Sequence, residues 1–137
     1  MAKDLIHEAV IEALQADGWI ITDDPLIVPI EETFVKMDLG AERVIAAQRE
    51  SEKIAVEIKT LNNPSIVYSF YEAFGQYLFY RDALIDQGIE REMYLGITDI
   101  AYNRLIKRSF IAKRIIQYQI KILVIDVTTK RVVKWEK

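Results

Sequence analysis

The sequence predicts an α/β domain in which a mixed β-sheet lies between helices. Helical and strand patterns follow one another in the order α-β-β-β-α-β-α-β-β, which is typical of a sheet with helices packed against it. Residues 120–127 form a nearly continuous apolar run, as expected for an interior strand that is buried on both faces. The 137 residues suffice for one domain over 1–137, and a hydrophobic content of 51% argues against disorder.

The first half of the chain is expected to hold one helix and three strands. Apolar side chains recur at helical spacing over residues 3–16 and end at an Asp-Gly pair, which predicts the first helix. Residues 25–30 are typical of a short strand, and two prolines confine it to an edge or an irregular path. Residues 33–48 and 53–61 are expected to form an antiparallel pair joined by a polar turn at 49–52.

The second half of the chain is expected to hold two long helices and three strands. Residues 66–87 form the first of these helices, with capping residues at 62–65 before it and Gly88 after it. A strand at 91–98 leads into a second long helix at 99–117. The last two strands are expected at 120–127 and 131–135.

Composition narrows the chemistry that is open to this chain. It has no cysteine, which excludes disulfides and thiolate chemistry, and its single histidine, His7, disfavours a histidine-rich metal site or a nucleophile-histidine triad. No apolar run approaches the roughly 20 residues of a membrane span, so we expect a cytoplasmic protein with no membrane partner. Any catalysis must then depend on carboxylates, lysine and a hard cation.

The net charge of -3 hides a strong asymmetry along the chain. Residues 1–100 carry 8 basic and 19 acidic side chains, whereas residues 101–137 carry 10 basic and 2 acidic ones. This pattern is typical of a nucleic-acid-binding surface, of complementary surfaces in a homodimer, or of ordinary solvated faces. Arg104, Lys107 and Arg108 lie at helical spacing and would suit phosphate contacts with DNA, although nothing near them encodes the reading of bases.

The stretch AVEIKTL at residues 55–61 raises the central functional question. Side chains alternate across a strand, so Glu57 and Lys59 share one face while their apolar neighbours share the other. Asp38 precedes them on the strand expected at 33–48. Two neighbouring carboxylates repel unless a cation or a shared proton compensates, and Mg²⁺ (or Mn²⁺) is the economical solution. The alternative is that all three side chains lie on a solvated face.

The expected hairpin presents a difficulty for that site. A turn centred at residues 50–51 would pair Asp38 with a position near 63, roughly 20 Å from Glu57. The two carboxylates can meet only if the turn lies nearer 47–48 or the strand bends at Gly40, where glycine is compatible with a bulge or a kink.

Asp38 followed by Glu57-Ile58-Lys59 resembles the PD-(D/E)xK signature of restriction-endonuclease-like nucleases, with Met37 in place of the proline. The resemblance implies a restriction-endonuclease-like fold, metal binding by Asp38 and Glu57, and a water-orienting or charge-stabilising role for Lys59. Glu8 matches a further acidic ligand on the first helix of many members. Gln76 and Tyr80 match a QxxxY motif that shapes the pocket in one branch. The alternatives are a solvated Glu8 and core positions for Gln76 and Tyr80.

Nearly the whole chain also resembles the XisH family, the fdxN element excision controlling factors. The resemblance lies in KDLIHEAVIEALQADGWIITDDPL, DLGAERVIAAQRESEKIAVEIKTL, SFYEAFGQYLFYRDAL and IDVTTKRVVKW. It implies a cyanobacterial protein that takes part in site-specific excision of DNA during heterocyst differentiation, with a recombinase and a companion called XisI. Two functions remain open: a Mg²⁺-dependent DNA endonuclease, and a non-catalytic regulator that binds DNA or protein.

Overall fold

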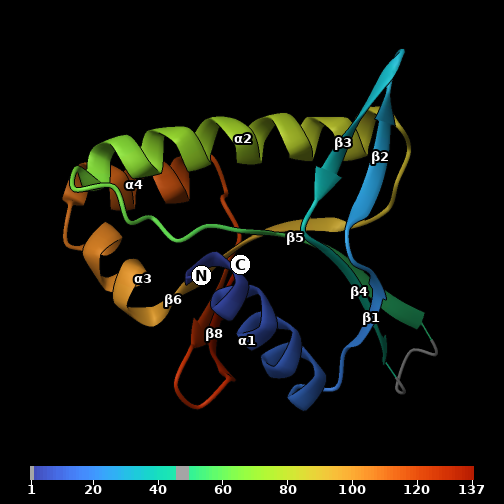
Figure 1. The fold of residues 1–137 in the computed structure, drawn as a ribbon. Coiled ribbons are helices and arrows are strands. Elements are labelled where there is room, and N and C mark those ends of the chain that lie inside the picture. The colour runs from blue at the N-terminus through green and yellow to red at the C-terminus, as the bar shows by residue number, and fades with distance from the viewer. Residues whose placement is uncertain (1, 46–49) are drawn as a thin grey trace.

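A computed structural model describes residues 2–45 and 50–137, and these residues form four α-helices and eight strands (Figure 1). Strands in the order β1-β4-β5-β6-β7-β8 build a six-stranded sheet, and β2 and β3 form a separate hairpin. The helices are α1 (Ala2–Ala16), α2 (Ile66–Asp86), α3 (Asp99–Ile106) and α4 (Ser109–Gln117). The strands are β1 (Ile20–Asp23), β2 (Leu26–Ile30), β3 (Thr33–Met37), β4 (Leu39–Ile45), β5 (Glu50–Ile58), β6 (Glu92–Thr98), β7 (Ile122–Asp126) and β8 (Arg131–Glu136).

The large sheet is mixed, as the sequence predicts. Strands β5, β6 and β7 run parallel, while β1, β4 and β8 are antiparallel to their neighbours. The crossover from β5 to β6 contains α2, and the crossover from β6 to β7 contains α3 and α4, so these helices supply the length that parallel pairing requires. The expected interior position of the apolar strand at 120–127 is confirmed, since β7 pairs on both sides.

Two apolar layers hold the sheet between its helices. One face packs against α1, with Val56 and Ile58 of β5 in that layer. The other face packs against α2, α3 and α4, and includes Ala55 of the same strand. Because strand side chains alternate, Glu57 belongs to the α2 side, where only 6% of its surface is exposed. No helix in the described part of the chain is long and apolar enough to cross a membrane.

The strand expected at 33–48 is two strands that belong to different sheets. β3 pairs with β2 in the hairpin, whereas β4 pairs with β1 and β5, and Asp38 is the residue between them. The polar turn expected at 49–52 is wrong, because Glu50 pairs with Ile45 and already belongs to β5. The alternative turn nearer 47–48 lies outside the described residues.

The single helix expected at 99–117 is also wrong, since the chain bends at Lys107 and Arg108 to give α3 and α4. Leu105 and Ile111 are both buried, with 0% and 2% of their surfaces exposed. Six residues along one straight helix would direct these two side chains about 120° apart around its axis. The bend lets both helices turn an apolar side toward the sheet.

Candidate functional site

Asp38 and Glu57 lie side by side because of the register between β4 and β5. Leu39 pairs with Val56, and this pairing brings Asp38, the residue just before β4, next to Glu57 on β5. The backbone N–H of Asp38 donates to Glu57 Oε1 at 3.2 Å, and the backbone N–H of Ile58 donates to Asp38 Oδ2 at 2.8 Å. Each carboxylate is therefore fixed by a backbone donor from the neighbouring segment.

Lys59 brings a positive charge to the same place. Its Nζ lies 3.7 Å from Glu57 Oε2, and its backbone N–H donates to the carbonyl of Gly96 on β6. The side chain of Glu57 is 8% exposed, whereas that of Lys59 is 31% exposed. A buried carboxylate requires compensation of its charge, and Lys59 supplies part of it while its amine still reaches solvent.

Gln76 and Tyr80 approach this group from α2. Their spacing of four residues puts them on one helix face, and Gln76 Nε2 donates to the Tyr80 hydroxyl at 2.9 Å. Burial raises the pKa of the Tyr80 phenol, as do the negative charges of Glu57 and Asp38, while the hydrogen bond from Gln76 opposes this rise. The phenol thus remains protonated at neutral pH, with its own hydrogen available to donate.

Gln76 has a further acceptor at this site. Its Oε1 is buried and has no hydrogen-bond partner within residues 2–45 and 50–137. A buried acceptor without a partner is costly unless a water or a ligand donates to it. The amide of Gln76 therefore offers a place for one more donor beside Tyr80.

A pocket of about 220 Å³ opens beside Lys59. The connection between β5 and α2 forms one wall, and the face of α2 that carries Gln76 forms another. Glu72 lies in this pocket, a residue that the sequence reasoning missed although it stands four positions before Gln76 on the same helix face. The lining residues are Lys59, Thr60, Leu61, Asn62, Asn63, Ser69, Glu72 and Ala73.

The wall between β5 and α2 is held by specific contacts. Leu61 is buried and adopts a positive φ of 54°, which is unfavourable for a leucine. Arg104 on α3 donates to the Leu61 carbonyl at 3.1 Å, and the backbone N–H of Asn63 donates to Ser69 Oγ at 3.1 Å. Arg104, expected to contact nucleic acid, therefore also anchors the pocket wall.

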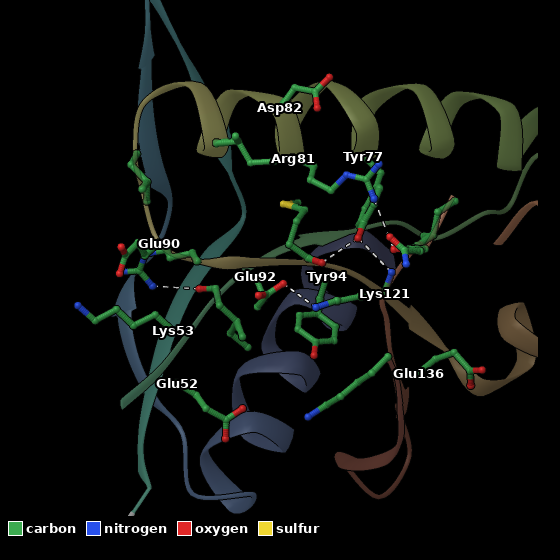
Figure 2. A pocket seen from close by; sticks show the side chains of 18 of the residues that line it. Glu52, Lys53, Tyr77, Arg81, Asp82, Glu90, Glu92, Tyr94, Lys121 and Glu136 are labelled. Atoms are coloured by element: carbon green, nitrogen blue, oxygen red, sulfur yellow. Dashed lines mark hydrogen bonds and ion pairs between the residues drawn. The ribbon is translucent and has the colours of Figure 1, made fainter. Parts of the chain in front are cut away.

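A larger hollow of about 1400 Å³ lies elsewhere, along the first residues of β5 and β6 and the segment just before β7 (Figure 2). Its polar groups bind one another: Lys121 Nζ lies 2.6 Å from Glu92 Oε2, and the Tyr77 hydroxyl donates to a backbone carbonyl and accepts a backbone N–H. Asp38, Glu57 and Lys59 do not line it, and of these three residues only Lys59 lines the smaller pocket. They lie where β5 ends, and in α/β sheets ligands bind at the carboxyl ends of parallel strands. This position favours the smaller pocket as the functional one.

Glu8 is separate from this group. It is exposed on α1, which packs on the sheet face opposite to that of Glu57. Within the described ranges, no three carboxylate or histidine side chains gather in a way that could hold a metal ion, so the structure does not unite Glu8 with Asp38 and Glu57. Its neighbour His7 lies on the same helix and contacts Asp24 through Nε2 at 2.9 Å.

The expected phosphate-binding residues lie near the bend between α3 and α4. Lys107 and Arg108 form that bend and are exposed, as is Arg104 one turn before it. None of the three has a carboxylate within 4 Å among the residues that the structure describes. These cations are available to an anionic partner.

Comparisons with known proteins give a consistent result. The model of the XisH protein family matches residues 1–133. The crystal structure of an XisH family protein from Nostoc punctiforme PCC 73102 shares 34% identity and a TM-score of 0.86, covering 97% of this chain and 99% of that one. The crystal structure of an fdxN element excision controlling factor protein from Anabaena variabilis shares 36% identity and a TM-score of 0.86, covering 98% and 99%. Among proteins with curated descriptions, none matches this chain.

Proposed function

The chain belongs to the XisH family, and from this premise we propose that it acts in the excision of a DNA element through a divalent-metal-dependent site that hydrolyses phosphodiester bonds. One observation carries the proposal: Glu57 accepts the backbone N–H of Asp38, Asp38 accepts the backbone N–H of Ile58, and the Lys59 amine lies 3.7 Å from the Glu57 carboxylate. A restriction-endonuclease-like nuclease would need these three residue types at this place.

The residues present fit a hard divalent cation. Asp38 and Glu57 offer carboxylate oxygens, which Mg²⁺ and Mn²⁺ prefer, and Mg²⁺ commonly keeps several waters when only one or two carboxylates hold it. When bound there, such an ion would lower the pKa of a coordinated water and offset charge on phosphate oxygens. Glu8, exposed on α1 at the opposite face of the sheet, has no part in holding this ion.

The remaining side chains suit phosphoryl transfer, which depends mainly on positioning and on neutralising charge. Lys59 orients a water or stabilises the phosphoryl oxygens, since its amine reaches both Glu57 and solvent. The Tyr80 hydroxyl accepts from Gln76 and so directs its own hydrogen elsewhere in the site. Arg104, Lys107 and Arg108 hold the phosphates of DNA outside the pocket.

The partners follow from the family. The relative from Anabaena variabilis is described as an fdxN element excision controlling factor, and we extend this role to the present chain. Its partners would be DNA, an XisI-like companion and a site-specific recombinase, and a homodimer would allow two copies to act on two strands.

A second function, a non-catalytic regulator that keeps this fold, is favoured by one observation. No third acidic ligand joins Asp38 and Glu57 among the described residues, and Lys59 already compensates part of the buried charge. The same surface would then bind DNA or the companion protein without cleaving.

A cleavage assay separates the two functions. Supercoiled, branched and single-stranded DNA are incubated with the protein and Mg²⁺ or Mn²⁺, beside Asp38→Ala, Lys59→Ala and, as a control on the same strand, the exposed Lys53→Ala. The nuclease proposal expects the first two variants to lose at least about 100-fold in rate while the control retains it. Equal activity in all variants, or none in the wild type, would leave the regulator as the function.

A further inference from the structure

The exposed side of α2 carries a stripe of aromatic side chains that the core does not use. Tyr68, Tyr71 and Phe79 are 51%, 69% and 56% exposed, and Gly75 stands between them. Spacings of three, four and four residues put all four positions on one helix face. We call Tyr68, Tyr71, Gly75 and Phe79 the aromatic stripe.

The two tyrosine rings of the stripe cover one face of each other and leave their outer faces exposed. The rings of Tyr68 and Tyr71 are stacked, with centroids 5.8 Å apart and planes 16° from parallel. A Cβ added at Gly75 would meet no atom within 4 Å, so this glycine has no packing reason to stand in the middle of a helix. Glycine destabilises a helix interior, and here it leaves a gap in the row of side chains between the tyrosines and Phe79.

The stripe is continuous with the candidate site at one end. The rings of Phe79 and Tyr80 are 6.4 Å apart, and Tyr80 is hydrogen-bonded to Gln76 within the site. Glu72, which lines the pocket beside Lys59, lies one turn from Tyr68 on the same helix. A ligand held by the aromatic stripe would thus lie along the rim of the pocket.

Positive charge lies near the segment that precedes α2, where Arg104 donates to the Leu61 carbonyl. Figure 1 shows α4 running alongside the first half of α2, and the contact between Phe74 and Tyr118, with centroids 5.1 Å apart, joins the two helices. The bend before α4 exposes Lys107 and Arg108, and Arg104 reaches the segment that precedes α2. Phosphates bound by these cations would therefore lie near the segment that leads into α2.

We infer that the aromatic stripe binds an unpaired segment of DNA by stacking its bases, with Arg104, Lys107 and Arg108 holding its phosphates. Every base has a flat face that stacks on an aromatic ring, whereas in a duplex these faces are covered by neighbouring bases. Unpaired or branched DNA is therefore the substrate class. This inference rests on the proposed function, because it extends the DNA path of that site.

The test measures binding without cleavage. Fluorescence anisotropy follows a labelled single strand and its duplex with full-length protein in EDTA at fixed salt. Tyr68→Leu with Tyr71→Leu should weaken single-strand binding at least about tenfold and duplex binding less than about twofold. Phe34→Leu is the matched control, since Phe34 on β3 is 51% exposed and lies outside the aromatic stripe. It should bind as the wild type does.

A second variant keeps the test independent of the tyrosines. Gly75→Leu places a side chain in the gap between the tyrosines and Phe79 without contacting the core. Circular dichroism should therefore show an intact fold while the affinity for the single strand falls. Wild-type affinity in the tyrosine variant, or equal affinity of the wild type for single strand and duplex, overturns the inference. So does a change in oligomeric state on light scattering without a change in DNA binding, which would make the stripe a protein interface. Metal-dependent cleavage is measured separately, and so either proposal can fail alone.

Discussion

Replacing Asp38 with asparagine separates the charge of the site from its shape. The amide has nearly the same size, and its oxygen can still accept the backbone N–H of Ile58, which lies 2.8 Å from Asp38 Oδ2. The substitution removes only the negative charge beside Glu57, which is 6% exposed. We therefore expect Asp38→Asn to fold normally and to lose its response to divalent ions.

Two opposing effects set the stability of the variant without metal. Removing one of two neighbouring carboxylates relieves a repulsion of roughly 1–3 kcal/mol at an effective dielectric near 20. Exchanging a charge-assisted hydrogen bond for a neutral one costs about 1 kcal/mol. The free energy of unfolding should thus be unchanged or up to about 2 kcal/mol higher than in the wild type.

Bound metal stabilises the folded state of the wild type but not that of Asp38→Asn. A site with a dissociation constant near 1 mM would stabilise the fold by about 1.4 kcal/mol at about 10 mM free Mg²⁺. With an entropy of unfolding of about 2.1 cal/mol/K per residue, this stabilisation raises the melting temperature by about 5 °C. Asp38→Asn should show almost none of this rise.

The assay is thermal unfolding with and without Mg²⁺, Mn²⁺ and Ca²⁺, each compared with Na⁺ at equal ionic strength. Asp82→Asn on the exposed face of α2 is the matched control and should respond to the ions as the wild type does. An equal rise of the melting temperature in wild type and Asp38→Asn would show that the ions bind elsewhere, and the metal assignment would be refuted.

Three further predictions concern the scaffold. In Gly40→Ala the new Cβ would lie 2.8 Å from Asp23 Oδ2, so the free energy of unfolding in urea should fall by about 1–2 kcal/mol. Gly75→Ala meets no neighbouring atom and should raise the free energy of unfolding by about 0.5–1 kcal/mol. A less stable Gly75→Ala than Gly40→Ala would contradict the close packing at Gly40. Tyr77→Phe removes a hydroxyl that donates to one backbone carbonyl and accepts one backbone N–H, each at 3.0 Å, and should lower the free energy of unfolding by about 2–4 kcal/mol. Burial raises the pKa of Tyr94 to about 12, so the folded state retains a proton that the unfolded state loses above pH 10. The free energy of unfolding should therefore fall between pH 10 and 12. Tyr94→Phe should show a shallower fall over this range, and an equal slope would contradict the assignment to Tyr94.

The elements that local patterns determine could be predicted from the sequence. The helix at 66–87 has a capping serine and a glycine after its end, and the structure places α2 at Ile66–Asp86 with Ser65 as its N-cap. The alternation in AVEIKTL likewise put Glu57 and Lys59 on one face, which the ion pair between them shows. Both patterns depend on neighbours within four residues, and such neighbours are visible in a sequence.

Pairing between distant segments could not be predicted in the same way. A long polar and apolar stretch at 33–48 gives no signal that the chain leaves one sheet for another at Asp38. Shifting a hairpin turn by a few residues changes every cross-strand partner, and polar residues at 49–52 were compatible with several turns. The same limit applies to α3 and α4, because the need to bury both Leu105 and Ile111 arises only from the sheet beneath them.

The connection between β5 and α2 shows why the site depends on these long-range contacts. Leu61 holds a positive φ, and this conformation is unfavourable for a residue with a side chain unless its surroundings impose it. Two contacts do so: the burial of the Leu61 side chain, and the bond from Arg104, which lies 43 residues away. Lys59 is fixed two residues earlier by the carbonyl of Gly96. The lysine is therefore held from both sides before any ligand binds, so its placement beside Glu57 is a property of the folded chain itself.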